Sequence, residues 1–302
     1  MTGDKEDFIM KKCMFTGSGV AIVTPFTDDG IDFDKLGELI EFQIREKIDA
    51  IIICGTTGEA STMPDAEHIS VIEYAVKAVN KRVPVIAGTG SNDTRHAIYL
   101  SKEAEKVGAD AILSVTPYYN KTTQKGLNEH FKAIANNISI PVILYNVPSR
   151  TNLNINPETV KQLSEIDNIV AIKECNLNQA GEIINLCGRD FSVYSGEDGL
   201  VLPFLSMGGK GVISVMANII PNDTHNMVIK YLDGDIEGSR NIQLKTLDLI
   251  KALFIEVSPI PVKTAMCLMG LNVGKCRLPL VDMDEKNVDT LRKAMKEYGL
   301  IS

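Results

Sequence analysis

The sequence predicts an α/β protein that folds as a (β/α)8 TIM barrel with a C-terminal helical extension. Short apolar runs rich in Ile and Val recur eight times, and amphipathic segments with helical spacing separate them. Strands that alternate with helices form parallel sheets, and eight parallel strands most simply close into a barrel. An open doubly wound sheet is the second choice, because no Gly-x-Gly-x-x-Gly turn follows the first run.

The apolar runs are mostly too short for helices, and most of them are bounded by Gly, Pro, Asn or Thr. The expected strands are 20–23, 50–54, 83–87, 111–115, 141–145, 169–173, 191–194 and 211–215. Helices are expected over 34–47, 64–79, 92–107, 123–136 and 157–163, where apolar residues fall largely on one face.

The pattern changes after the eighth run. Residues 222–232, 236–254, 261–269 and 284–298 all have helical spacing, which is more than the one helix that closes a barrel. We therefore expect a leader at 1–15, a barrel at 16–220, and a C-terminal helical region at 221–302 that packs on the barrel.

Composition excludes several classes of protein. The 302 residues are 44% hydrophobic and 23% charged, as in ordinary soluble globular proteins. A net charge of -8 without a long basic run gives no support for nucleic-acid binding. No apolar stretch approaches the length of a membrane span, and the acidic N-terminus is unlike a signal peptide. Six cysteines without a C-x-x-C pair suit a reducing cytoplasm.

A lysine ends the sixth apolar run, where Ile-Val-Ala-Ile leads directly into Lys173. A charged ammonium is costly to bury unless it is paired or loses its proton. Lys173 therefore either reaches the barrel rim, pairs with a carboxylate such as Glu174, or is a buried amine with a function. Catalytic groups of a barrel lie where its strands end, and this is where Lys173 stands.

The other strand ends bring hydroxyls and an arginine to the same rim, without a His/Asp/Glu cluster that would indicate a metal site. A buried amine among hydroxyls suits attack on a ketone to form a Schiff base, with tyrosine as a proton shuttle. The Gly-Thr-Thr-Gly turn at 55–58 suits a small carboxylate, unless it is only a strand-to-helix turn. Arg150 suits a second carboxylate, unless it is a surface charge.

Seven rim segments together resemble the pyruvate-dependent class I aldolases typified by N-acetylneuraminate lyase and dihydrodipicolinate synthase, and within them the synthase branch. The segments are 19–26, 55–59, 88–92, 116–120, 145–151, 172–174 and 259–263, and the resemblance covers about 16–300. It implies condensation of pyruvate with L-aspartate 4-semialdehyde, which gives 4-hydroxy-tetrahydrodipicolinate for lysine and diaminopimelate synthesis. The alternative is a pyruvate-releasing sugar-acid aldolase of the same superfamily, which tends to lack an arginine at position 150.

The resemblance also implies a role for each site residue. Lys173 forms the imine with pyruvate, and no cofactor or metal is needed. Tyr145, Thr56 and Tyr119 relay protons, with Tyr119 donated by a neighbouring subunit of a homotetramer, a dimer of dimers. The substrate-binding groups are the Thr57 side chain, the Arg150 side chain, and the backbone around Gly196 and Ile213.

Regulation by L-lysine is expected to be weak or absent. In lysine-inhibited members of the family, a cleft at the dimer interface binds the amino acid. The matching positions keep His68, Asn92 and Tyr118, but His96 stands where a glutamate is expected. Loss of that carboxylate removes a charge-assisted contact to the α-amino group of lysine.

Overall fold

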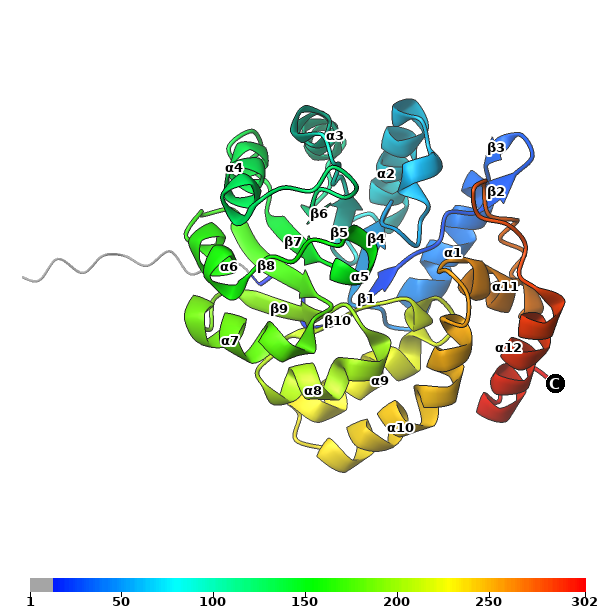
Figure 1. The fold of residues 1–302 in the computed structure, drawn as a ribbon. Helices are drawn as coiled ribbons and strands as arrows, with labels where there is room; N and C mark the ends of the chain where they lie inside the picture. The colour runs from blue at the N-terminus through cyan, green and yellow to red at the C-terminus, as the bar shows by residue number, and fades with distance from the viewer. Residues whose placement is uncertain (1–12) are drawn as a thin grey trace, which may run out of the picture.

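The structure, a computed structural model, describes residues 13–302 (Figure 1). Eight parallel strands form a closed barrel in the order β1-β10-β9-β8-β7-β6-β5-β4, and helices surround it (Figure 1). The predicted fold class is therefore confirmed. The barrel strands are β1 Gly17–Ala21, β4 Ala50–Ile53, β5 Val85–Gly88, β6 Ala111–Val115, β7 Val142–Asn146, β8 Ile169–Glu174, β9 Ser192–Ser195 and β10 Gly211–Ser214.

The helices of the barrel layer begin where the sequence supplies capping groups. The side chain of Asp32 accepts a hydrogen bond from the Lys35 backbone, and the side chain of Thr123 caps its helix in the same way. The helices are α1 Phe33–Arg45, α2 Asp65–Val79, α3 Thr94–Lys106, α4 Gln124–Ala135, α5 Pro148–Thr151, α6 Pro157–Ser164, α7 Leu177–Cys187, α8 Val201–Ser206 and α9 Pro221–Leu232.

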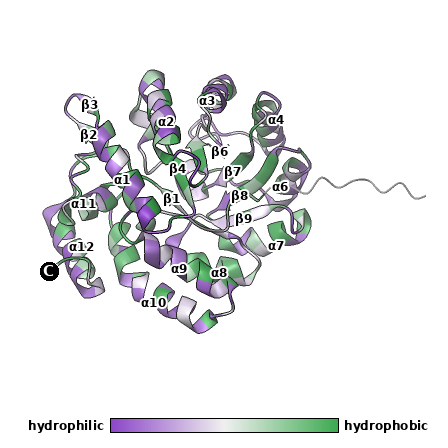
Figure 2. Cartoon of the chain, turned by 180° about the vertical axis from the view of Figure 1, so that it is seen from behind, coloured by the Kyte–Doolittle hydropathy of each residue, from purple (hydrophilic) through white to green (hydrophobic). Residues whose placement is uncertain are grey.

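Alternating side chains of each strand divide the core into two layers. On β4, Ile51 and Ile53 pack outward with the helices, whereas Ile52 packs inside the barrel. The surrounding helices carry mixed hydrophilic and hydrophobic residues, as expected of elements with one buried face (Figure 2). A barrel filled by side chains is a solid support, so chemistry is confined to its ends.

Helix α9 closes the barrel by packing on β1, and three further helices extend the chain: α10 Ile236–Leu253, α11 Ile260–Leu268 and α12 Glu285–Tyr298. α10 packs on α9 and α12, on one side of the barrel (Figure 1). The predicted C-terminal helices are present. The domain boundaries after residues 15 and 220 stay a prediction, and residues 1–12 of the expected leader lie outside the described residues.

Four elements were not predicted. A two-stranded antiparallel hairpin, β2 Phe26–Thr27 with β3 Gly30–Ile31, follows the first barrel strand. The helices α5, α7 and α8 were also not placed by the sequence, although α7 and α8 occupy segments where the alternation required helices. The first strand begins earlier than the predicted 20–23, because Gly17 and Ser18 pair with β10 despite their low apolar character. Within residues 13–302, no helix is long and apolar enough to cross a membrane.

Candidate active site

Lys173 lies on β8 with its side chain almost fully buried, at 6% exposure. Its register partners are Tyr145 on β7 and Tyr194 on β9. The Lys173 Nζ atom lies 4.4 Å from the centre of the Tyr145 ring. Within the described chain it forms no ion pair, so the sequence-based alternatives of a paired or a rim-exposed lysine are wrong.

Burial lowers the pKa of the Lys173 amine, because the charged form loses its hydration. The nearby Arg150 guanidinium acts in the same direction, whereas Asp198 and Glu197 act against it. A lowered pKa makes the neutral amine, the nucleophilic form, more accessible than it is for an exposed lysine. Burial of this lysine therefore shifts it toward the form that the predicted role requires.

Gly196 provides the space that the lysine occupies. A Cβ atom at this position would lie 3.2 Å from Lys173 Cε and 2.4 Å from Cys175 Sγ. Real Cβ atoms essentially never approach another atom as closely as the second distance. Gly196 thus lies directly against the Lys173 side chain, and it is the absence of a Cβ atom that leaves room for that side chain.

The turn between β4 and α2 brings two threonines to the same cavity. Gly58 N donates to Gly55 O at 3.1 Å, and Glu59 N donates to Thr56 O at 3.1 Å. Thr57 is buried, at 5% exposure, and lines the cavity beside Thr56. The sequence-based interpretation of this turn as a seat for a carboxylate is compatible with this position.

Tyr145 is buried and hydrogen-bonded to Thr56, as a proton relay requires. Burial raises the pKa of the Tyr145 phenol, and the Thr56 hydrogen bond opposes that effect. The phenol is therefore held in its protonated form. The third member of the expected relay, Tyr119, is 91% exposed and does not line the cavity of its own chain.

The cavity has a volume of about 500 Å³ and opens at the carboxyl ends of the strands. Lys173, Tyr145, Thr56, Thr57, Arg150 and Gly196 all line it. Arg150, on α5, also donates to the Ser258 carbonyl at 3.1 Å. Ile213 is fully buried in the barrel interior and is not among the lining residues.

The sequence did not reveal that the C-terminal region reaches this cavity. The segment between α10 and α11 contributes Phe254, Glu256, Val257 and Ser258 to its wall. The region predicted as an extension of the barrel therefore also covers the site. The apolar residues between the two helices were the only available sequence feature that could have indicated this contact. Helical periodicity does not report long-range packing.

Two carboxylates near Lys173 were also left without a role by the sequence. Glu197 lines the cavity, and burial raises its pKa. Asp198 is fully buried and accepts from the backbone N–H groups of Val215 and Met216, at 3.1 and 2.9 Å. Burial also raises the pKa of Asp198. Their position directly after Gly196 was the sequence feature that could have placed them near the site.

Glu174 follows Lys173 on β8 and does not line the cavity, as expected from the alternation of side chains along a strand. Its carboxylate accepts from Asn146 Nδ2, Gln179 Nε2 and the Asn176 backbone, at 2.7 to 3.0 Å. Burial raises its pKa to about 7, and these donors oppose the shift. Glu174 therefore connects β8 to β7 and to the start of α7, and it is not a partner of Lys173.

A second cavity, of about 400 Å³, adjoins the first and shares Thr56, Tyr145 and Arg150 with it. His68 and Tyr118 line it, whereas Asn92 does not. His96 also lines it, with Nε2 2.9 Å from Asp65 Oδ1. Two of the three residues predicted for regulation thus meet here. Over residues 13–302, no group of three or more His, Cys, Asp or Glu side chains is placed to hold a metal ion.

Comparison with known proteins identifies this arrangement. Residues 14–298 match the model of the dihydrodipicolinate synthetase family. The chain belongs to that family. This confirms the resemblance to the pyruvate-dependent aldolases and the prediction of a Schiff-base class I aldolase, a lyase.

The chain is 73% identical to 4-hydroxy-tetrahydrodipicolinate synthase of Acetivibrio thermocellus, covering 97% of this chain and 100% of that one. The crystal structure of dihydrodipicolinate synthase from Aquifex aeolicus is similar to it with a TM-score of 0.93 at 48% identity, covering 95% and 99%. The enzyme from Cyanidioschyzon merolae with lysine bound also has a TM-score of 0.93, at 41% identity, covering 96% and 100%. These names favour the synthase over the sugar-acid aldolase alternative.

Proposed function

We propose that the chain condenses pyruvate with L-aspartate 4-semialdehyde and forms 4-hydroxy-tetrahydrodipicolinate, a step toward lysine and diaminopimelate. The observation that carries the proposal is the buried amine of Lys173, which has no carboxylate partner among residues 13–302 and lies beside Tyr145 in an open cavity. Such an amine attacks the ketone of pyruvate and forms an imine with loss of water. The family and the names of its members support the same reaction.

In this mechanism the imine draws electrons from the methyl group of pyruvate, so that a proton leaves and an enamine carbon forms. Thr56 and Tyr145 move that proton, since they are hydrogen-bonded and line the cavity. The enamine carbon attacks the aldehyde carbon of the second substrate. The α-amino group of the second substrate then attacks the imine carbon, which closes the ring and releases the Lys173 amine, so no cofactor is consumed.

The remaining binding roles follow from charge and position. Thr57 and the N–H groups of its turn hold the pyruvate carboxylate. Arg150 at the mouth receives the carboxylate of the aldehyde substrate. The backbone at Gly196 borders the imine. The role that the resemblance implies for the backbone at Ile213 is not proposed for this chain, because Ile213 does not line the cavity.

The site becomes complete in a homotetramer, a dimer of dimers, in which Tyr119 enters the relay of a neighbouring subunit. Tyr119 has φ of 71°, an uncommon conformation for tyrosine, and 91% exposure. Mixing Tyr119→Phe and Lys173→Met subunits tests this, because each mixed pair contains one intact site. Activity should rise above that of either variant alone, and no rise would contradict the shared site.

The compartment proposed is the cytoplasm, where pyruvate is available and cysteines such as Cys54 and Cys175 stay reduced. Feedback by L-lysine is proposed to be weak or absent, because His96 is engaged by Asp65 in the second cavity. Assays across sub-millimolar lysine test this, and inhibition in that range would overturn it.

Borohydride reduction in the presence of pyruvate, followed by peptide mass mapping, tests the function. A single pyruvate adduct on the peptide that contains Lys173 is the expected result. An adduct on another lysine, or none, contradicts the mechanism. Turnover of pyruvate with aspartate semialdehyde, and not cleavage of N-acetylneuraminate, separates the synthase from the sugar-acid aldolase.

A further inference from the structure

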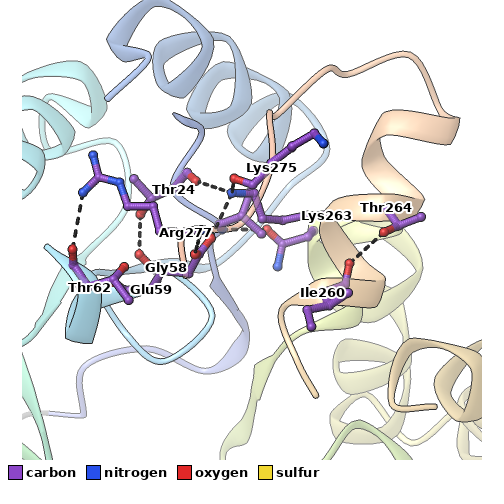
Figure 3. Close-up of polar contacts among 11 residues, drawn as sticks. Thr24, Gly58, Glu59, Thr62, Ile260, Lys263, Thr264, Lys275 and Arg277 are labelled. Atoms are coloured by element: carbon purple, nitrogen blue, oxygen red, sulfur yellow. Dashed lines mark hydrogen bonds and ion pairs between the residues drawn. The ribbon is translucent and has the colours of Figure 1, made fainter. Parts of the chain in front are cut away.

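A second lysine is buried in the molecule, outside the catalytic cavity. Lys263 lies on α11, and Glu59 ends the turn at 55–59, called the threonine turn below. Their side chains form an ion pair of 2.9 Å and are 3% and 1% exposed. Neither residue lines the catalytic cavity. Figure 3 shows the pair together with Thr24, in the loop after β1, and with Lys275 and Arg277 of the segment after α11.

Every polar atom of this pair has a partner. Lys263 Nζ also donates to the backbone carbonyls of Thr24 and Lys275, at 3.1 and 2.8 Å. The second Glu59 oxygen accepts from the Arg277 backbone N–H at 2.9 Å. An ammonium has three N–H groups, and here all three are used. Burying both charges is costly, so a fully satisfied buried pair indicates that a particular geometry is being fixed.

The geometry that it fixes is the end of the threonine turn. Glu59 has φ of 56°, in the left-handed region that non-glycine residues rarely adopt. Such a residue persists only when its surroundings hold it in place. The Thr24 hydroxyl donates to Gly58 O at 2.7 Å, so both final residues of the turn are anchored.

The residues that anchor the threonine turn are themselves bonded to other parts of the fold. The Arg277 guanidinium forms an ion pair with Glu67 on α2 and lies 4.2 Å from the centre of the Phe26 ring. The Lys263 Nζ atom lies 4.6 Å from the centre of the same ring. One aromatic ring therefore lies close to two cations, and each cation is paired with a different carboxylate. Motion of α11 relative to α2 would break these contacts together.

We propose that Lys263 and Glu59 are positioning residues for the condensation, through which the C-terminal helical region sets the placement of Thr56 and Thr57. This inference rests on the proposed function, in which those threonines serve pyruvate. Glu59 lies two residues after Thr57, and its backbone N–H is bonded to Thr56 O. A shift of the Glu59 carboxylate is thus transmitted directly to the turn that receives the keto acid.

The test compares Glu59→Gln and Lys263→Met with the double variant that carries both changes. Glutamine keeps the shape of Glu59 but loses the charge, and the double variant removes both charges. Each protein is titrated with pyruvate, and the borohydride-trapped adduct is measured. We expect half-maximal trapping of Glu59→Gln at about 10-fold higher pyruvate, with less than about a twofold change in KM for the aldehyde.

The double variant separates positioning from general stability. We expect it to recover most of the melting temperature lost by Lys263→Met, because no unpaired charge stays buried, but not the response to pyruvate. Asp49→Asn is the matched control, because Asp49 pairs with His225 at 2.8 Å at the opposite end of the barrel. It should lower stability without altering the pyruvate response.

Two outcomes would overturn the inference: pyruvate trapping by Glu59→Gln that equals that of the parent protein, or recovery of both stability and pyruvate response in the double variant. The proposed function fails separately. In that case the parent protein itself gives no adduct on Lys173, whatever the variants show.

Discussion

The two lysines that are buried among residues 13–302 have different partners, and we propose different uses for them. Lys173 and Lys263 are 6% and 2% exposed, and each has an aromatic ring within 5 Å, at 4.4 and 4.6 Å. Lys263 donates to a carboxylate and two carbonyls, whereas Lys173 has no ion pair within residues 13–302. Burial alone does not make a nucleophile, because the surrounding acceptors determine whether the proton can leave.

The strongest test of this comparison is the same substitution at both sites. Lys173→Met should reduce turnover on the order of 10⁴-fold or more, because the imine cannot form. Its stability should be unchanged or higher, because an unpaired buried amine is replaced by an apolar side chain of similar length. Turnover and thermal unfolding measure the two effects. Residual activity within tenfold of the parent would contradict the assignment of Lys173 as the residue that forms the imine.

Lys263→Met should show the reverse balance, with a large loss of stability. The Glu59 carboxylate would stay buried without its cation, which costs roughly 3 to 5 kcal/mol of unfolding free energy. Urea unfolding measures this loss. The pyruvate adduct, where the variant folds, should still form on Lys173. An unfolding free energy equal to that of the parent would show that the two lysines are not as different as their partners indicate.

Gly196→Ala should reduce kcat/KM for pyruvate by about 10²-fold, because the new methyl group displaces the Lys173 side chain from its position. Gly199→Ala is the matched control, since nothing lies within 4 Å of a Cβ atom there. Steady-state kinetics of both variants sharpen the comparison. Equal effects at the two glycines would mean that the space around Lys173 is not limiting.

The smallest expected effect is a change in pH dependence. The Lys173 amine is neutral above its pKa, which burial lowers, and the negative charge of Glu197 raises that pKa. Glu197→Gln removes this charge, so the acidic limb of the pH profile of kcat/KM for pyruvate should move to lower pH. Glu182→Gln on the exposed side of α7 is the control and should leave the profile in place. A move to higher pH would contradict the electrostatic account.

Much of the fold was predictable because hydrophobic periodicity reports local structure. The predicted strand 111–115 has the same bounds as β6. Most other predicted strands differ from the observed ones by one or two residues at an end. The first strand was placed too late, since Gly17 and Ser18 join the barrel through backbone pairing alone. Helix α5 was missed because Val-Pro-Ser-Arg is also typical of a loop.

The site was predictable where it depends on strand ends and not where it depends on packing between distant segments. Lys173, Tyr145, Thr57 and Gly196 meet in one cavity because the carboxyl ends of parallel strands share one rim. The contribution of Phe254 and its neighbours depends on how α10 and α11 dock. That docking is set by side-chain fit over the whole surface, which no local pattern encodes.

The anchor of the threonine turn also has a consequence for protein synthesis. Lys263 and Arg277 are made after all eight strands, because β10 ends at Ser214. A nascent chain can therefore pair every strand of its barrel while the groups that hold Glu59 are still unmade. Catalytic competence should arrive later than the barrel itself, and ribosome-bound chains released at different lengths would show the order.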